Sequence, residues 1–304
     1  MKKILLTGAT GFIGSHLLEG LGKNGYEVVV LKRSTSSVWR ITNSKYLNKA
    51  FDIDFKELSK VFSENSFFAV VHLATHYVKD DNVVSIKEMF DSNVTFPSQL
   101  IELASRSGVT CFINTGTFFE YNCEFMPVNE KAEISPFNLY AKTKNAFENV
   151  VKTYQHNMNI VTFRLFSPYG EKDNDKLIPY IIKHSIRDKN ILLSDGLQKL
   201  DFIYVKDIVN AYTGMLNYLS VNRNIGSYEV FNLGSGFPIS VREIVSIIDQ
   251  QLGSKSKVIW GKPSDYDIPI AYACTKKLFD HISWCPKYSI HEGIEKTIAY
   301  YKSL

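Results

Sequence analysis

Several features that would place this chain in a special class of protein are scarce or missing. Its 304 residues include only four cysteines, and because these lack the spacing of metal ligands, we expect reduced thiols and no metal site. No apolar run is long enough to cross a membrane, and the one near the start is too short for a signal sequence. No Lys/Arg-rich run favours nucleic acid, and the net charge is a mild +4. We therefore expect a cytoplasmic globular protein that binds neither nucleic acid nor membrane.

Internal repeats and low-complexity linkers are missing too, and the N-terminal half instead alternates strand and helix patterns. This alternation is typical of an α/β fold in which helices cover both faces of a parallel sheet. The candidate strands are Ile4–Leu6, Val28–Leu31, Phe68–Leu73, Cys111–Asn114 and Val161–Leu165, and the candidate helices are Ile13–Lys23, Glu57–Phe62, Ile86–Ser107 and Tyr140–His156.

The first strand leads into a glycine-rich turn that reads Thr7-Gly8-Ala9-Thr10-Gly11-Phe12-Ile13-Gly14. We expect Gly8 where the chain turns most tightly, Gly11 where the backbone approaches a pyrophosphate, and Gly14 where the helix packs on the strand. The N-terminus of the following helix offers N–H groups and a partial positive charge to phosphates. The strand before the turn and the amphipathic helix after it favour a dinucleotide site that also includes Thr10, Phe12 and Ile13, over a purely structural turn.

The second strand ends in two cations, Lys32 and Arg33. Folds that bind NAD usually place an acidic residue here, where it accepts hydrogen bonds from the adenosine ribose. A carboxylate would repel a 2′-phosphate, whereas a guanidinium can hold one with two hydrogen bonds. The pair therefore favours NADP, and the alternative is that both residues are solvated loop cations.

A tyrosine and a lysine lie four residues apart at the start of the last of these candidate helices, as Tyr140 and Lys144. At this spacing both side chains lie on one face of the helix. A phenol with a pKa near 10 is a poor catalyst at neutral pH, and a nearby ammonium is expected to lower that pKa. We predict that the two residues form an acid–base pair beside the cofactor.

The spacing of Gly8, Gly11 and Gly14, together with Tyr140 and Lys144, resembles that of the extended short-chain dehydrogenase/reductase family, which acts largely on nucleotide-linked sugars. The resemblance covers nearly the whole chain and implies a Rossmann-type, doubly wound parallel sheet with a smaller, interleaved C-terminal domain. It implies a homodimer formed through the helices at 86–107 and 140–156. It assigns residues 1–165 and about 202–234 to an NADP-binding domain, and residues 166–201 and 235–304 to a substrate-binding domain.

The resemblance also places further residues around the cofactor. The resemblance implies that the cofactor contacts Asp52 and Ile53 at its adenine, the segment Leu73, Ala74 and Thr75, and Asn93. We expect His72 to be a hydrogen-bonded core residue, since buried polar groups need partners. His76 and Tyr77 lie just beyond the strand's carboxyl end, where such sheets bind ligands, and are candidate substrate contacts.

The segment Thr115-Gly116-Thr117-Phe118-Phe119-Glu120 resembles the family motif [ST]-x-x-V-Y-G. This places the catalytic hydroxyl at Thr115, with Thr117 as the alternative and as a candidate substrate contact. Family dehydratases carry Asp-Glu where this chain has Gly116-Thr117, and neither of these residues can move a proton near neutral pH. Dehydration is therefore disfavoured. Glu120 replaces the glycine of the motif.

The C-terminal part resembles the family less closely. The resemblance suggests Ser167, Leu177, Lys199 and Lys262 as substrate contacts. Leu200 replaces an arginine that holds the diphosphate, so Lys262 is the candidate diphosphate ligand and Lys199 a helper. The alternative for Lys262 is a solvated loop lysine.

Together these patterns suggest an NADPH-dependent 4-ketoreductase of a nucleoside-diphosphate-linked keto-deoxyhexose. The segment around Thr115 resembles synthases that complete CDP-3,6-dideoxyhexoses, and reductases of dTDP- or GDP-linked sugars share most of it. In this hypothesis Tyr140 gives a proton to the oxygen, Thr115 hydrogen-bonds it, and Lys144 holds the ribose. The alternatives are a sugar 4-epimerase that retains NAD and a non-catalytic dinucleotide-binding sensor.

Overall fold

A computed structural model of the chain describes residues 1–47, 49–53, 55–77, 83–222, 226–263 and 268–304. The chain forms two compact units. The first comprises Met1–Asn122, Ala132–Leu165 and Val209–Phe231, and the second Cys123–Lys131, Phe166–Ile208 and Asn232–Leu304. Compared with the expected domain ranges, residues 123–131, 202–208 and 232–234 belong to the second unit.

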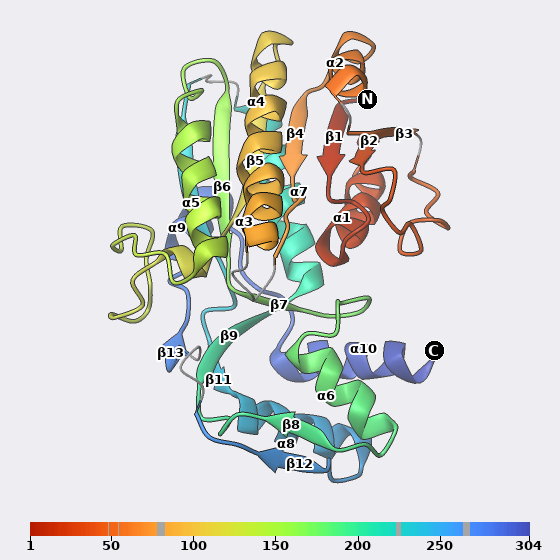
Figure 1. Cartoon of the computed structure of the whole chain (residues 1–304), viewed down its shortest axis with the longest axis vertical. Coiled ribbons are helices and arrows are strands. Elements are labelled where there is room, and N and C mark those ends of the chain that lie inside the picture. Colours follow the sequence, from red (N-terminus) through yellow and green to blue (C-terminus); the bar gives the residue numbers. More distant parts are fainter. Residues whose placement is uncertain (48, 54, 78–82, 223–225, 264–267) are drawn as a thin grey trace. The chain divides into compact units, whose positions relative to one another are not determined.

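The first unit contains a seven-stranded sheet in the order β10-β6-β5-β4-β1-β2-β3 (Figure 1). Strands β1 to β6 pair in parallel, in the 3-2-1-4-5-6 order of a dinucleotide-binding fold. The expected Rossmann-type, doubly wound fold is confirmed. The strands are β1 (Lys3–Thr7), β2 (Glu27–Lys32), β3 (Lys49–Asp52), β4 (Ala69–His72), β5 (Cys111–Thr117), β6 (Asn159–Leu165) and β10 (Tyr228–Leu233).

Helices cover both faces of this sheet. Figure 1 shows α4 and α5 in front of the strands and α7 behind them. Under the front helices, Leu5, Val70 and Phe112 from the sheet pack with Leu100 of α4 and Phe147 of α5. The helices are α1 (Phe12–Lys23), α2 (Phe55–Ser63), α3 (Val83–Phe90), α4 (Phe96–Arg106), α5 (Leu139–Lys152) and α7 (Val205–Val221), with a π-helix at Asp91–Thr95 and a 3-10 helix at Phe118–Glu120.

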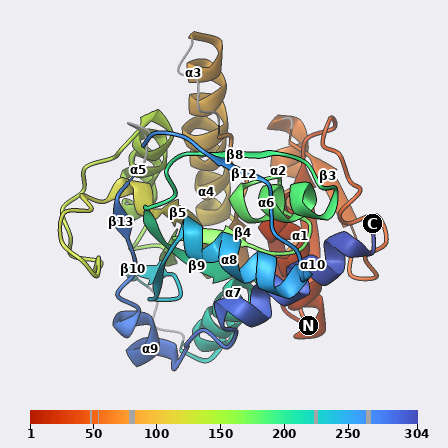
Figure 2. The same ribbon diagram turned by 90° about the horizontal axis from the view of Figure 1, so that it is seen from below.

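The described part of the second unit is built from short strands and four further helices. Its four-stranded sheet contains β7 (Ser167–Tyr169), β9 (Lys199–Tyr204), β11 (Pro238–Ser240) and β13 (Ile270–Ala271), and a separate pair joins β8 (Ile191–Leu193) to β12 (Val258–Trp260). Figure 2 shows α6 (Leu177–Ile186), α8 (Val241–Leu252) and α10 (Ile290–Lys302) packed together, and α9 (Lys276–Ile282) completes the set.

Three elements differ from those expected. The helix expected over 86–107 is divided into α3, a π-helix and α4, and β3 was not predicted. Strand β5 continues to Thr117, so Thr115 lies within the strand and not after it. Among the described residues, no helix is both long enough and apolar enough to cross a bilayer.

Candidate active site

The glycine turn joins β1 to α1 in a very confined space. Gly8 has a φ of +72°, and a Cβ on it would lie 2.7 Å from the backbone nitrogen of Ala74. A Cβ on Gly14 would lie only 2.1 Å from the carbonyl oxygen of Gly8. Gly11 is the N-cap of α1 and provides no side-chain cap, and the first turn contains no acidic residue. The first N–H groups of a helix have no acceptor within the helix, so this helix start fits the diphosphate of a dinucleotide.

Thr7 fixes the neighbouring segment after β4. Its hydroxyl oxygen accepts hydrogen bonds from the backbone nitrogens of Leu73 and Ala74, both at 3.2 Å, and lies 2.9 Å from Nδ1 of His72. His72 is fully buried, and its Nε2 has no hydrogen-bond partner among the described residues. Burial, reinforced by the charge of Lys144, lowers the pKa of His72 well below its usual value. The expected core histidine is thus neutral and bonded through one ring nitrogen only.

The expected adenosine corner carries a carboxylate as well as cations. Lys32 and Asp52 are register partners at the ends of β2 and β3, and Lys32 Nζ lies 2.9 Å from Asp52 Oδ1. Arg33 is exposed. Arg40, which sequence reasoning missed, donates a hydrogen bond of 3.3 Å to the carbonyl of Thr10 in the glycine turn. Asp52 therefore offsets the charge of Lys32, while Arg33 remains at the end of the strand.

Tyr140 and Lys144 lie in the first turns of α5, whose N-cap is Asn138. Lys144 is 2% exposed, and burial lowers the pKa of its amine to about 8. The Tyr140 ring meets Tyr77 edge to face at 4.9 Å, and its hydroxyl hydrogen-bonds Thr75. Burial raises the pKa of Tyr140, although the Thr75 hydrogen bond opposes this. Desolvation of the phenolate is the largest influence on this pKa, and the expectation that the lysine lowers it stays a prediction.

Asn93, in the π-helix, is fully buried and holds this region together. Its Oδ1 accepts hydrogen bonds from the hydroxyl of Thr75 (3.0 Å) and the backbone nitrogen of His76 (2.8 Å). Its Nδ2 donates to the carbonyl of His76 (2.9 Å) and to the hydroxyl of Thr143 (3.0 Å). With both donors and both acceptor positions used, Asn93 orients the residue that bonds Tyr140 and has no free group for a cofactor. The ring of His76 lies 3.3 Å from Glu88.

The two candidate threonines have different partners. The Thr115 hydroxyl donates to the carbonyl of His72 at 2.9 Å and lies 2.7 Å from the hydroxyl of Tyr212 on α7. Because its single proton is donated to His72, Thr115 accepts from Tyr212. The Thr117 oxygen accepts from the backbone nitrogen of Phe119 at 3.3 Å, and among the described residues its own proton has no partner. The hydroxyl proton of Thr117 is therefore available to a ligand, whereas that of Thr115 is donated to His72. Both threonines stay candidates for the catalytic hydroxyl.

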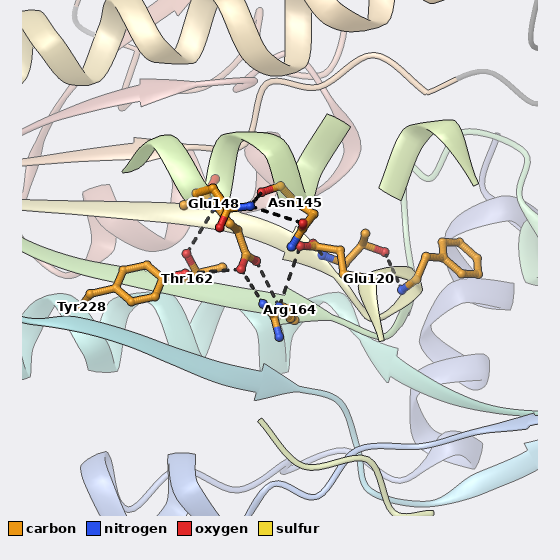
Figure 3. A network of polar contacts seen from close by, with 10 residues as sticks. Glu120, Asn145, Glu148, Thr162, Arg164 and Tyr228 are labelled. Carbon is orange, nitrogen blue, oxygen red and sulfur yellow. Dashed lines mark hydrogen bonds and ion pairs between the residues drawn. The ribbon is translucent and has the colours of Figure 1, made fainter. Parts of the chain in front are cut away.

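Sequence reasoning missed a buried charged network beside β5, shown in Figure 3. Arg164 on β6 donates from Nε and Nη2 to the Glu148 carboxylate, at 3.0 and 2.5 Å. Glu120, fully buried, approaches the same guanidinium with an Arg164 Nε to Glu120 Oε2 distance of 3.9 Å. Glu148 continues the helix face of Tyr140 and Lys144 at four-residue steps. The signal that could have revealed the network was Glu120 at the glycine position of the motif.

The expected substrate contacts in the second unit occupy separate elements. Ser167 lies in β7, Leu177 begins α6, and Lys199 begins β9 with its side chain exposed. Lys262 follows β12 and is exposed, and residues 264–267 just after it lie outside the described residues. These four positions are consistent with ligand contacts, but no hydrogen bond among them defines a site.

Comparisons with known proteins agree with this architecture. A family model described as the NAD dependent epimerase/dehydratase family matches residues 4–234. The CDP-abequose synthase of Salmonella muenchen is 33% identical, over 98% of this chain and 97% of that protein. A putative UDP-glucose 4-epimerase of Methanocaldococcus jannaschii is 27% identical, over 99% and 98%. The solved structure of UDP-glucuronic acid 4-epimerase from Bacillus cereus, in complex with UDP-glucuronic acid and NAD, has a TM-score of 0.88 at 26% identity and covers 99% of both chains.

Proposed function

This chain belongs to the NAD dependent epimerase/dehydratase family, and on that premise we propose that it reduces the C4 keto group of a nucleoside-diphosphate-linked keto-deoxyhexose with NADPH. The substrate we favour is a CDP-4-keto-3,6-dideoxyhexose, because the CDP-abequose synthase relative matches almost the full length of both proteins. A dTDP- or GDP-linked sugar is the second choice. The reaction would serve the biosynthesis of deoxysugars for surface polysaccharides such as O-antigen.

The observation that carries this proposal is the placement of Tyr140 and the buried Lys144 one helical turn apart on α5. A phenol is protonated at neutral pH, so Tyr140 has a proton that it can donate to a keto oxygen, although burial raises its pKa and so makes it a weaker acid in the free chain. Thr75 donates its own proton to Asn93 and can only accept from Tyr140, so a bound keto oxygen would replace Thr75 as the acceptor of that proton. Lys144 would hold the cofactor ribose, and either Thr115 or Thr117 would hydrogen-bond the keto oxygen.

The first unit is the proposed cofactor-binding part. When bound, the nicotinamide cofactor supplies the hydride. Its diphosphate would lie against Gly11 and the start of α1, and Arg33 with Lys32 would hold a 2′-phosphate. We assign the sugar nucleotide to the second unit, with Lys262 and Lys199 as candidate diphosphate contacts.

One observation favours a second function, an NAD-dependent sugar 4-epimerase. Asp52 brings a carboxylate to Lys32, at the corner where NAD-binding folds present an acid to the ribose. The epimerase relatives, and the Bacillus cereus structure that contains NAD, point the same way.

Adding NADPH to the purified chain with a CDP-4-keto-3,6-dideoxyhexose distinguishes the two functions. A reductase oxidises one NADPH for each sugar reduced, which the loss of NADPH absorbance measures. An epimerase interconverts C4 isomers with retained NAD and needs no added reductant, and that result would overturn the proposal. No turnover with any keto sugar would favour the dinucleotide-binding sensor.

We also propose a homodimer formed through α4 and α5. These two helices pack together, and just beyond the end of α5 the Tyr154 hydroxyl donates to Glu102 on α4 at 2.8 Å. Apolar side chains are exposed on the preceding α3, among them Val84 and Phe90. Analytical ultracentrifugation tests this proposal, and a monomer at micromolar concentration would contradict it.

A further inference from the structure

Glu120 is a fully buried carboxyl group at the position where the family motif has a glycine. It ends the 3-10 helix that directly follows β5. Its Oε1 accepts a hydrogen bond of 2.7 Å from the backbone nitrogen of Thr117, and its Oε2 has no hydrogen-bond partner among the described residues. A carboxylate in this state would carry a buried charge that Arg164, 3.9 Å from Oε2, compensates only in part, which is costly.

A second buried carboxyl, Glu148, lies against the same piece of backbone. A Cβ built on Gly116 would lie 2.7 Å from Glu148 Oε1 and 2.9 Å from Glu120 Oε1, so both oxygens are packed over this glycine. The two side chains are within hydrogen-bonding reach of each other. Two carboxyl groups can form a hydrogen bond only if one of them carries a proton.

The surrounding donors identify which carboxyl is protonated. Glu148 accepts two hydrogen bonds from Arg164 and a third, of 3.3 Å, from the hydroxyl of Tyr228, all of which stabilise its charged form. Glu120 accepts one backbone hydrogen bond and is farther from the guanidinium, at 3.9 Å. The proton therefore belongs on Glu120.

We propose that Glu120 is a positioning residue which, as the neutral acid, donates a hydrogen bond to Glu148 and accepts one from Thr117. This bridge ties the end of β5, with its candidate catalytic threonines, to the face of α5 that carries Tyr140 and Lys144. Its effect on turnover rests on the proposed ketoreductase function, whereas its protonation state can be tested without any substrate.

Ionisation of Glu120 would break the bridge. Burial and the negative charge of Glu148 raise the pKa of Glu120 well above its usual value, while the charge of Arg164 and the Thr117 hydrogen bond oppose this. Above that pKa, two like charges would meet over Gly116. The titratable and charged groups around Glu120 are Lys144, Glu148 and Tyr140 on α5, Arg164 on β6, Tyr121 next to it in the chain, and Tyr228 on β10.

A simpler role is also visible, because Thr117 and Glu120 form the capping box of the short helix. Capping boxes at Ser240–Glu243 and Ser289–Glu292 provide matched controls, and their hydrogen bonds lower the pKa of both glutamates. Gln can replace Glu in a capping box. Glu120→Gln therefore keeps the cap and the donor to Glu148, and removes only the ability to ionise.

Infrared spectroscopy tests the protonation state directly. At neutral pH the wild type should show the carbonyl stretch of a protonated carboxylic acid, and this band should vanish in Glu120→Gln but persist in the control Glu292→Gln. A raised pKa makes stability fall as pH rises, so the melting temperature of Glu120→Gln should gain on the wild type as pH increases. The melting temperature of Glu292→Gln should instead fall relative to the wild type as the pH rises from the acid range, because the pKa of Glu292 is lowered. A Glu120→Gln spectrum identical to the wild type would overturn the proposal.

Turnover then tests the positioning role. Glu120→Ala removes the bridge, and because a shift of about 1 Å can cost 10²-fold, kcat should fall by up to about that factor. Glu120→Gln should recover most of the loss and should keep activity at alkaline pH where the wild type declines. If Glu120→Gln were as impaired as Glu120→Ala, the ionised carboxylate would be the working form and the proposal would fail. If neither the wild type nor any variant reduced a keto sugar, the proposed function would fail. The infrared result would still decide whether Glu120 is protonated.

Discussion

Replacing Thr115 with valine separates a catalytic role for this residue from a structural one. The change keeps the branched shape and removes one hydroxyl, together with its hydrogen bonds to the His72 carbonyl and to Tyr212. Tyr212 is fully buried, so in this variant its phenol loses the acceptor it uses. An unsatisfied buried donor costs about 1–3 kcal/mol of unfolding free energy.

The matched change is Tyr212→Phe, which leaves the Thr115 bond to His72 intact and should cost about 0.5–1.5 kcal/mol, the net value of a neutral hydrogen bond. In the double variant both partners are apolar, so its loss should be smaller than the sum of the two single losses. Urea denaturation of all four proteins gives this coupling energy.

The same set of proteins then decides the catalytic hydroxyl. If Thr115 binds the keto oxygen, Thr115→Val should lower kcat by about 10²-fold, as when one donor to a developing oxyanion is removed, and Tyr212→Phe should not. If Thr115→Val and Tyr212→Phe lost activity equally, and in proportion to their loss of stability, Thr115 would have only a structural role. Thr117→Val provides the second comparison. A larger loss there than in Thr115→Val, at unchanged stability, would refute the assignment of Thr115 and move the role to Thr117.

Tyr140→Phe should leave folding and NADPH affinity intact and lower turnover by about 10²–10⁴-fold, the usual contribution of a general acid; near-normal NADPH consumption would contradict this role. Lys144→Ala should weaken NADPH binding along with turnover, as fluorescence titration would measure. Burial lowers the pKa of Lys144 to about 8, so between pH 8 and 10.5 the unfolded chain binds more protons than the folded one. The free energy of unfolding should therefore rise with pH in this range. Lys144→Met should flatten that rise when stability is measured by urea denaturation at several pH values. Arg33→Ala should weaken NADPH more than NADH by about 1.5–3 kcal/mol, and wild-type protein with equal dissociation constants for both would contradict the NADP assignment.

The features that the sequence could predict depend on local spacing. The glycine turn is recognisable because Gly8 and Gly14 lie at fixed distances between a buried strand and an amphipathic helix. The common face of Tyr140 and Lys144 follows from helix periodicity alone. The family match and the strand order of the sheet confirm the family and the fold that these patterns predicted.

The features that could not be predicted depend on contacts between distant segments. β3 has only four residues and one buried side chain, so it is too short to show the alternating pattern of a strand. Because β3 was not predicted from the sequence, the pairing of Asp52 with Lys32 could not be predicted either. Helix spacing shows a lysine near Tyr140 but not the burial that raises the pKa of its phenol. The four hydrogen bonds of Asn93 likewise become visible only once α5 and the segment after β4 are placed.

The structure changes the argument against dehydration. Gly116 and Thr117 carry no acid themselves, yet a Cβ on Gly116 would lie within 3 Å of two carboxyl groups, those of Glu120 and Glu148. They are unsuited to that chemistry because Glu120 is fully buried and Glu148 is 3% exposed and bound to Arg164, whereas a general acid or base must reach the proton it moves. The two departures from the family motif are also linked. A side chain at position 116 would begin 2.7 Å from Glu148 Oε1 and 2.9 Å from Glu120 Oε1. An aspartate at position 116, as in a dehydratase, would therefore require both glutamates to move.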